Sequence, residues 1–276
     1  VLAVKALGYE KDLPAGNFYI KEASTNYRLI KKIVNSVGLS RKITVLEGWS
    51  IKDIASKLQT SFNIDKESFF RASKSKKLLK KWGINSVSFE GYLFPDTYQL
   101  PEDVDALGVI DRMVSEYSKN MTNAMRKRMT EIGLSENEVL TLASIIEGEA
   151  IYNSERPRIS GVYHNRLKKR MRLQADPTIQ YIIKDAPRRL LNKDLKIKSP
   201  YNTYQNYGLP PGPINNPGIE SIKAALYPEQ VDFLFFVAKG DGYHTFSKTE
   251  KEHNKAKREF QKIRRQNRKS KKVTKT

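Results

Sequence analysis

A helix start signal at residues 135 to 138 constrains this chain more than any other short stretch. The sequence there is S-x-x-E, a capping box in which Ser135 and Glu138 satisfy backbone N–H groups that the first turn of a helix leaves without partners. The residues that follow, as far as the stretch LASIIEGEA at 142 to 150, are mostly apolar. They therefore predict a helix that starts at Ser135 and is buried in a core.

Two carboxylates interrupt the end of this predicted helix. At about 100° per residue, Glu147 and Glu149 point about 200° apart, so they cannot flank one bond as a pair. Glu147 lies nearer the middle of the apolar face, by a margin of about 30°. A carboxylic acid against an apolar wall keeps its proton to higher pH, which is what cleavage of a glycosidic bond needs. The alternative is an exposed helix end, where both carboxylates meet water.

Composition sets limits on the function. The chain has 276 residues, of which 39% are hydrophobic, enough for a core in one large domain or two smaller ones. It has no cysteine, which excludes disulfides, thiolate metal sites and cysteine nucleophiles. The net charge is +20, and eight of the basic residues lie between 262 and 276. Such a charge favours polyanionic surroundings, whether nucleic acid, anionic lipid or an anionic cell-wall polymer.

The N-terminal part of the chain predicts a small region of strands and helices. Residues 14 to 35 are typical of a turn, a short strand and an amphipathic helix. Residues 43 to 58 repeat this order, with Ser50 as the N-cap of the helix. A second helix is expected from Lys66 to Ala72, followed by a lysine-rich, solvated stretch. We expect the main domain boundary near residue 90, where the chain becomes aromatic and rich in turns.

The rest of the chain is expected to be mainly helical. One long helical stretch should run from about Asp103 to Gly133, and a later helix should have Pro157 in its first turn. The sequence FLFFVA at 233 to 238 is typical of a strand. We also predict a short β-rich insertion near residues 171 to 215 and a disordered basic tail at 263 to 276. The fold class is therefore α+β.

Polar and aromatic side chains in the turn-rich loops are free to contact a polar substrate. Tyrosine rings can stack on sugar faces, although core packing explains tyrosines more often. With Glu149 from the helix end, the candidate substrate-binding residues are Gln174, Asp176, Thr178, Tyr201, Asn202 and Tyr204.

Other chemistries lack their sequence patterns. The three histidines, His164, His244 and His253, do not have the spacing of a metal site. No P-loop, G-x-S-x-G or G-x-G-x-x-G motif occurs. The positive charge favours nucleic-acid binding, but the sequence has no recognisable nucleic-acid-binding motif. We therefore expect no metal, no cofactor and no specific nucleic acid as a partner. The longest apolar runs are far shorter than the ~20 residues of a membrane span.

A series of motifs gives the chain a specific resemblance. In chain order they are EGYLFPDTY, LASIIEGEA, ER at 155 and 156, NRL at 165 to 167, MRLQADPTIQY, YNTY, GLPPGPINNPG, FFVAKGDGYHTF and EHN at 252 to 254. With this order and spacing over residues 89 to 260, the chain resembles the YceG-like endolytic murein transglycosylases, known as MltG. The stretch ITVLEGWSIKDIASKL resembles the LysM-like subdomain of the same family.

The resemblance implies a division of the chain and a cellular place for it. The expected parts are a strand-rich segment at 1 to 38, a LysM-like subdomain at 39 to 89 and a catalytic domain at 90 to 262. The family implies a bacterial enzyme on the extracytoplasmic face of the cell membrane, anchored there by a single N-terminal helix. It cuts nascent peptidoglycan strands, and so terminates their elongation, beside the peptidoglycan synthases. Because the chain starts without methionine, we expect that the anchoring segment has been removed.

The resemblance also implies a mechanism with one catalytic residue, Glu147. It would protonate the oxygen between N-acetylmuramic acid and N-acetylglucosamine, then as a carboxylate help the muramic C6 hydroxyl close onto C1, which leaves a 1,6-anhydro end. Gln174, Asn202 and Glu149 are candidates to stabilise the developing positive charge.

Other functions stay open at this point. One is a hydrolytic muramidase that pairs Glu147 with a distant carboxylate such as Asp176. Another is a non-catalytic protein that binds peptidoglycan through the LysM-like subdomain and its basic surface. The family has also been labelled aminodeoxychorismate lyase, but the sequence offers no evident pyridoxal-phosphate site for that reaction.

Overall fold

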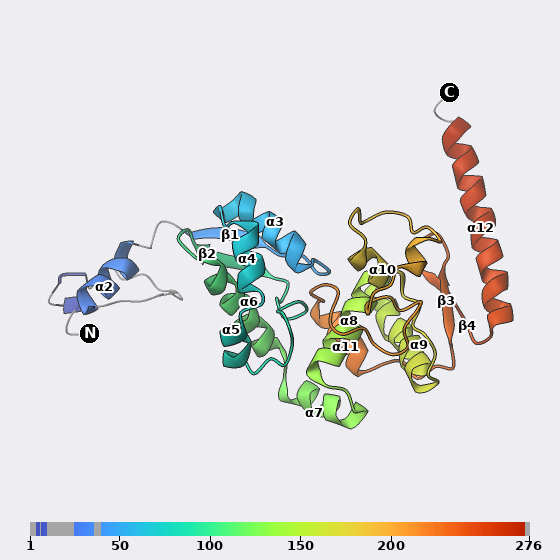
Figure 1. The fold of residues 1–276 in the computed structure, drawn as a ribbon, viewed down its shortest axis with the longest axis horizontal. Coiled ribbons are helices and arrows are strands. Elements are labelled where there is room, and N and C mark those ends of the chain that lie inside the picture. Colours follow the sequence, from blue (N-terminus) through green and yellow to red (C-terminus); the bar gives the residue numbers. More distant parts are fainter. Residues whose placement is uncertain (1–3, 6, 10–24, 36–39, 274–276) are drawn as a thin grey trace. The chain divides into compact units, whose positions relative to one another are not determined.

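The structure is a computed structural model that describes residues 4–5, 7–9, 25–35 and 40–273. The described residues belong to two compact units, Val1–Ser118 and Lys119–Thr276 (Figure 1). Helices predominate, and the two sheets in the described part have two strands each. The predicted fold class, α+β, is confirmed.

The first unit is built on an antiparallel pair of strands that are far apart in sequence. Strand β1 (Ser40–Thr44) pairs with β2 (Thr97–Pro101), and Ile43 lies opposite Tyr98. Both of these side chains are buried, so the sheet presents one apolar face to the unit's core. The helices of this unit are α2 (Asn26–Asn35), α3 (Ile51–Phe62), α4 (Lys66–Ala72), α5 (Lys76–Lys81) and α6 (Ala106–Asn120).

Local signals in the first unit predict its elements well. Ser50 caps α3 and forms a complete capping box with Asp53, as its sequence indicates. The buried carboxylate of Glu90 adds a second acceptor at this helix start, for the N–H of Ile51 at 2.9 Å. Helix α4 has the expected bounds, and α2 is the helix expected at the end of residues 14 to 35. The strand expected before α2 falls outside the described residues.

The boundary between the compact units lies later than the composition change near residue 90. Strand β2 comes after that position, yet it completes the sheet with β1. Tyr92 and Leu93 are also buried within the first unit. The aromatic, turn-rich stretch is therefore a loop that leads into the sheet, and the units divide at residues 118 and 119. The functional division at residues 39 to 89 and 90 to 262 stays a prediction.

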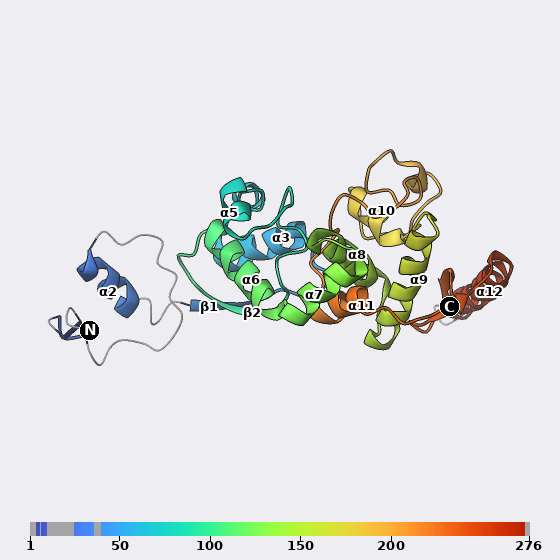
Figure 2. The same cartoon turned by 90° about the horizontal axis from the view of Figure 1, so that it is seen from below.

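Helix α8 (Glu136–Glu149) is the centre of the second unit. Its predicted capping box is present: the N–H of Ser135 donates to Glu138 Oε2 at 2.8 Å, and the N–H of Glu138 donates to Ser135 Oγ at 3.3 Å. All eight residues from Val139 to Ile146 are buried, so the helix is enclosed on every side. Figures 1 and 2 show it among α7 (Asn123–Ile132), α9 (Arg156–Lys168), α10 (Asp176–Ile182) and α11 (Ile219–Leu226).

The prediction of one long helical stretch before α8 is wrong in one respect. The stretch is divided into α6 and α7, because Thr122 starts a new helix. The Thr122 hydroxyl oxygen accepts the N–H of Met125 at 3.2 Å, as an N-cap does. A threonine within a helical periodicity gave no sign of a break, since the periodicity continues on both sides of it.

The predicted β-rich insertion is also wrong. Residues 171 to 215, all of which are described, contain α10 and the short helix η3 (Asp194–Lys196) but no strand. The chain there satisfies its backbone with side chains: the Asn202 amide donates to the carbonyls of Leu195 at 3.1 Å and Ile197 at 2.8 Å. Such bonds replace the ladder of a sheet. The strands described in this unit, β3 (Phe235–Ala238) and β4 (His244–Ser247), come later and include the predicted FLFFVA strand.

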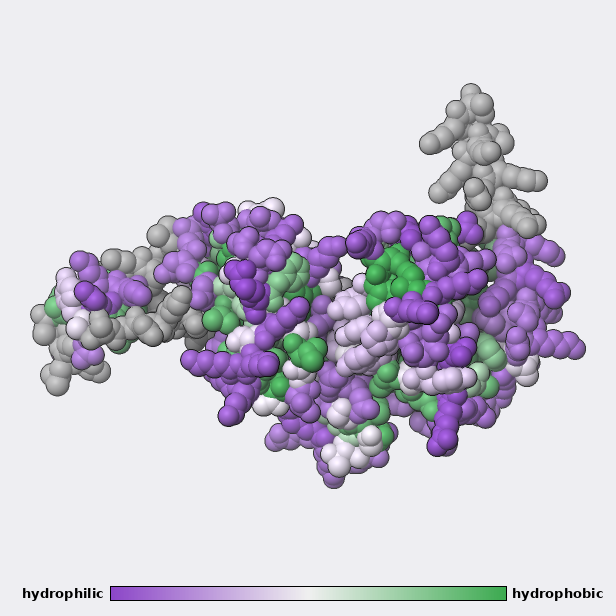
Figure 3. Space-filling view, viewed as in Figure 1, coloured by the Kyte–Doolittle hydropathy of each residue, from purple (hydrophilic) through white to green (hydrophobic). Residues whose placement is uncertain are grey.

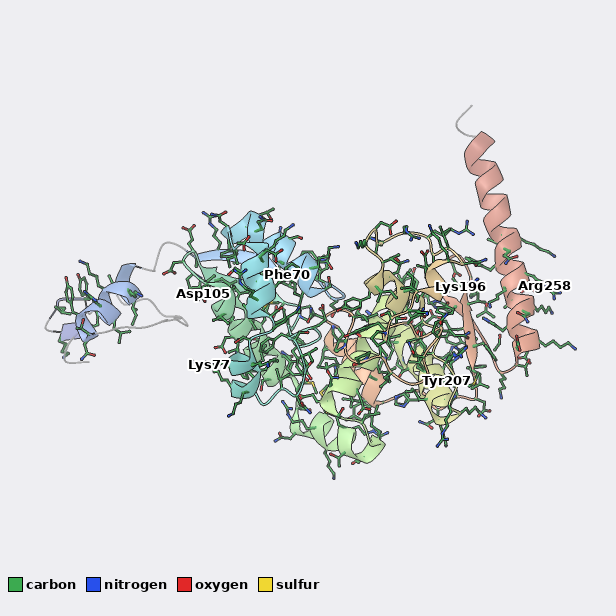
Figure 4. The ribbon with its side chains drawn as sticks, viewed as in Figure 1. Phe70, Lys77, Asp105, Lys196, Tyr207 and Arg258 are labelled. Carbon is green, nitrogen blue, oxygen red and sulfur yellow. The ribbon has the colours of Figure 1, made fainter. Side chains whose placement is uncertain are left out.

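Helix α12 (Glu250–Val273) follows the β3–β4 hairpin and packs against both of its strands. The sequence predicted disorder from residue 263, whereas the helix continues to Val273. Lysine and arginine are good helix formers, and Glu250 and Glu252 favour the helix start, so local propensity accounts for the extension. Arg258 marks this helix in Figure 4, and hydrophilic residues cover its described part in Figure 3. In the described part of the chain, no helix is long and apolar enough to cross a membrane.

The capping box of α8 predicts a measurable contribution to stability. Ser135→Ala should lower the free energy of unfolding by about 1 kcal/mol, because it removes the acceptor for the Glu138 N–H. Urea denaturation followed by circular dichroism measures this loss. Thr130→Ala, at an exposed position inside α7 of the same unit, is the control and should stay within about 0.5 kcal/mol of the parent. Equal losses in the two variants would contradict the capping role.

Candidate active site

The two glutamates at the end of α8 have different partners. Both carboxylate oxygens of Glu147 accept hydrogen bonds from the protein: Oε1 from Arg156 Nη2 at 2.8 Å and Oε2 from the backbone N–H of Gly218 at 3.0 Å. The side chains of Glu147 and Arg156 are each only 6% exposed. Glu147 is therefore part of a buried ion pair that joins α8 to the start of α9 and to the loop before α11.

Arg156 fixes the corner between α8 and α9. Besides Glu147, its guanidinium donates to Asn153 Oδ1 at 3.0 Å and to the carbonyl of Ala150 at 3.4 Å. The preceding residue, Glu155, is also buried. Its Oε1 accepts the backbone N–H of His244 at 3.0 Å, and its Oε2 is hydrogen-bonded to the ring Nδ1 of His244 at 2.9 Å. Two neighbouring charged side chains thus attach the end of α8 and the start of β4 to the same short turn.

The loop before α11 is attached to α8 along its length. The Ser144 hydroxyl accepts the N–H of Ile214 at 3.0 Å, and the Ser144 carbonyl accepts from the Asn215 amide at 2.9 Å. One turn further along α8, a Cβ atom added to Gly148 would lie 2.7 Å from Pro177 Cβ. Only glycine at this position lets α10 approach so closely, and this approach brings Asp176 toward Glu149.

Glu149 has a different environment, which changes its protonation. It is half-buried, and Tyr163 Oη donates to its Oε1 at 2.8 Å. Burial raises the pKa of Glu149 to about 7; the Tyr163 hydrogen bond and the charge of Arg166 lower it, while the charge of Asp176 raises it. A carboxyl group with a pKa near neutrality can both give and take a proton at physiological pH.

The residues around Glu149 form a connected polar group, which we call the Glu149 cluster: Glu149, Tyr163, Arg166, Asp176 and Tyr204. Tyr204 donates a short hydrogen bond to Asp176, and burial raises the pKa of Tyr204. Arg166 is 7% exposed and donates to the carbonyls of Leu234 and Leu173, at 2.6 and 2.9 Å. The cluster thus brings residues of three helices and a loop together around the carboxyl group of Glu149.

The predicted substrate-binding residues divide into two groups. Glu149, Asp176 and Tyr204 lie in the cluster, and the exposed Gln174 borders it by accepting from Arg166 at 3.3 Å. These side chains keep surface that a substrate can reach.

The second group, Thr178, Asn202 and the half-buried Tyr201, supports the loop structure. Thr178 and Asn202 are fully buried, with hydrogen bonds to Ala175 O at 2.7 Å and to the carbonyls of the 195–197 turn. The ring of Tyr201 packs against that of Tyr181, with centroids 5.0 Å apart. Their positions favour support of the loop over direct contact with a ligand.

Four residues of the site were not singled out by sequence: Arg156, Tyr163, Arg166 and Gly218. Arg156 stands in the ER motif, but it contacts Glu147 from another helix, so no helical periodicity links them. The contribution of Gly218 is a backbone N–H, which carries no side-chain signal at all.

The site has no evident place for a metal. Within the described residues, no group of three or more His, Asp or Glu side chains is arranged to hold a metal ion. His164 bonds the Ala225 carbonyl and His244 bonds Glu155, while His253 stacks on Phe235 with centroids 5.1 Å apart. The histidines are thus distributed over three separate places.

Comparison with known proteins shows the family of the chain. The model of the YceG-like family matches residues 1–259. The chain belongs to the YceG-like family. Among its relatives in that family, one from Bacillus subtilis (strain 168) is named an endolytic murein transglycosylase. It is 38% identical over 263 residues, which cover 89% of this chain and 72% of the relative.

Two further relatives of this YceG-like chain extend the comparison. A Streptococcus pneumoniae (serotype 2, strain D39) protein of the same name is 29% identical over 258 residues. The match covers 82% of this chain but 47% of that protein, so the chain spans about half of its length. A crystal structure of a yceG-like protein from Listeria monocytogenes has a TM-score of 0.73 at 35% identity, covering 92% of this chain and 88% of the other.

The raised pKa of Glu149 predicts how stability depends on pH. Between its ordinary value of 4.5 and the folded value of about 7, the native state keeps a proton that the unfolded chain releases. The free energy of unfolding should therefore fall as pH rises through this window, by at most about 1.4 kcal/mol per pH unit from this group. Glu149→Gln should remove that slope, as measured by urea denaturation from pH 4.5 to 8.

A matched variant tests the cause. Tyr163→Phe removes a hydrogen bond that favours the carboxylate, so the pKa of Glu149 should rise further and the slope should persist above pH 7. Parallel curves for the parent and Glu149→Gln would contradict the assignment.

Proposed function

We propose that this chain is a lytic transglycosylase that cuts glycan strands of peptidoglycan internally. The bond cleaved is the β-1,4 link between N-acetylmuramic acid and N-acetylglucosamine, and the product carries a 1,6-anhydro-muramic end. The observation that carries the proposal is a half-buried carboxyl group, Glu149, which ends helix α8 and accepts a hydrogen bond from Tyr163 at 2.8 Å; burial raises its pKa to about 7, which suits it to act as acid and then as base. Membership of a family with relatives named endolytic murein transglycosylases supports it.

The proposal assigns the proton transfers to Glu149, whereas the sequence suggested Glu147. Both oxygens of Glu147 are engaged by Arg156 and Gly218, so the group has donors directed at it from two sides. Glu149 has one such donor, Tyr163, and burial raises its pKa to about 7, so that both its protonated and its ionised forms are present at neutral pH. The assignment of Glu147 as the acid stays a prediction, and the experiment below separates the two.

The reaction is balanced without water. Protonated Glu149 gives its proton to the glycosidic oxygen, and the bond from that oxygen to C1 of the muramic ring breaks with the electron pair leaving on oxygen. The Glu149 carboxylate then takes the proton of the C6 hydroxyl as O6 bonds to C1. The glutamate is protonated again at the end, so one carboxyl group completes the cycle.

The charge on C1 in the transition state needs a negative or polar neighbour. In this proposal the exposed carboxylate of Asp176, held by Tyr204, and the exposed amide of Gln174, which borders the cluster, are these neighbours. Glu147 acts as a positioning residue: through Arg156 and Gly218 it holds the end of α8 against α9 and the loop before α11. Asn202 contributes through the loop that it supports.

The cellular setting is part of the same proposal. We place the enzyme on the outer side of the bacterial cell membrane, tethered by a helix outside this chain and acting next to the peptidoglycan synthases as a terminator of strand elongation. The first unit, in which helices α3 to α5 lie between the paired strands β1 and β2 in chain order, serves in this proposal as a LysM-like subdomain that holds glycan. The basic charge of +20 suits an anionic wall.

Product mass tests the reaction and the residue together. Digestion of purified peptidoglycan by the parent chain should release anhydro-muropeptides, which are lighter by about 18 Da than the products of hydrolysis because no water is added. Glu149→Gln should lower the rate by about 10²-fold or more, since the amide cannot transfer the proton. Glu147→Gln, the matched variant on the same helix, should keep a measurable rate of the same product.

The other outcomes have definite meanings. Loss of activity in folded Glu147→Gln with retention in Glu149→Gln would return the acid role to Glu147. Reducing ends in place of anhydro ends would favour a hydrolytic muramidase, with Asp176 as its second carboxylate. Binding of peptidoglycan with no products from the parent would favour a non-catalytic wall-binding protein.

A further inference from the structure

An exposed pair of tyrosines lies beside the candidate active site and has no part in the mechanism above. The rings of Tyr152 and Tyr243 are stacked, with centroids 4.2 Å apart and planes 20° apart. Despite this contact, 38% of Tyr152 and 39% of Tyr243 stay exposed, and the neighbouring Ile151 is 69% exposed. An exposed group of three large apolar side chains is a candidate contact surface.

The pair is held close to the two glutamates. Tyr152 follows Glu149 by three residues, so their Cα atoms are no more than about 11 Å apart. Tyr243 directly precedes His244, whose backbone and ring both bond Glu155 at 3.0 and 2.9 Å. Since Glu155 precedes Arg156, the partner of Glu147, the same turn that orders the carboxylates also orders both rings.

The hairpin turn is shaped around Tyr152. The hydroxyl of Tyr152 donates to the carbonyl of Asp241 at 3.4 Å. A Cβ atom added to Gly242, which has a φ of +92°, would lie 2.8 Å from Tyr152 Cε2. The turn therefore needs glycine both for its backbone conformation and for room beside the ring. A side chain whose conformation is already fixed loses little conformational freedom when a ligand binds over it.

We propose that Tyr152 and Tyr243 form a sugar-stacking platform for a pyranose ring of the glycan strand, outside the disaccharide whose bond is cleaved. This inference rests on the proposed function. The C–H groups on the face of a pyranose carry partial positive charge and match the negative faces of aromatic rings. The exposed Lys239 and Asp241 of the same turn, 3.9 Å apart, provide polar partners for hydroxyl and N-acetyl groups at the rim.

A sugar-stacking platform at this place would help the enzyme to cut within a glycan strand. An enzyme that cuts within a strand must hold sugars beyond the scissile bond, because binding energy from remote parts of a substrate positions the reacting part. The tyrosine pair extends the contact surface from the end of α8 to the β3–β4 hairpin, which lie in one compact unit.

The test is to titrate the full chain with N-acetylglucosamine oligomers of two to six sugars and to measure binding by calorimetry. Tyr243→Ala should weaken binding by about two- to tenfold, from the energy of one aromatic contact. Tyr243→Phe keeps the ring and should bind like the parent. Tyr227→Ala is the matched control: this tyrosine is 47% exposed in the same unit, under the guanidinium of Arg128, and its loss should leave affinity unchanged.

Several results would overturn the platform. One is a Tyr243→Ala variant that binds the oligomers as tightly as the parent. The others are a loss of affinity in Tyr243→Ala that is matched by Tyr227→Ala or by Tyr243→Phe. Tyr152→Ala, with its melting temperature measured, provides a second variant if Tyr243→Ala does not fold. Digestion of peptidoglycan in parallel separates the two proposals: anhydro products with tyrosine-independent binding remove only the platform, and tyrosine-dependent binding without products removes only the catalytic function.

Discussion

The buried ion pair between Glu147 and Arg156 is the interaction on which the site depends. A charged pair this deeply enclosed is stable only when its remaining hydrogen-bonding groups are also satisfied. Here the backbone N–H of Gly218, the carbonyl of Ala150 and the amide of Asn153 complete it. Because these groups come from four segments of the chain, the pair fixes their mutual positions, and loss of either charge leaves the other buried and unpaired.

The same arrangement gives the two glutamates at the end of α8 different chemical environments. Glu147 and Glu149 are on one helix, two residues apart, and point to different sides of it. One is enclosed by a guanidinium and a backbone N–H, and the other meets a tyrosine hydroxyl and the field of Asp176. Two carboxylates in contrasting environments are a common way to divide roles in carbohydrate chemistry. The close approach of α10 at Gly148 is what brings Asp176 into this balance.

Sequence patterns succeeded where a local signal was complete. The capping boxes at Ser50 and Ser135 and the proline at the start of α9 each act within one helical turn, so their outcome depends little on the rest of the chain. Patterns failed where distant residues decided the result. The strands expected in 171 to 215 depended on pairing partners outside that stretch, and the strands that do pair show how distant such partners can be: β1 and β2 are more than fifty residues apart.

For the site, the sequence by itself determined that a carboxylate ends a buried helix and which family motifs surround it. It favoured Glu147 by a small margin, because the helical wheel measures direction around one axis alone, and on it Glu147 lies only about 30° nearer the middle of the apolar face than Glu149. Only the tertiary structure decided their partners. Protonation of a carboxyl group depends on the charges, donors and solvent within a few ångströms, and these come from α9, α10 and two loops that the wheel does not contain.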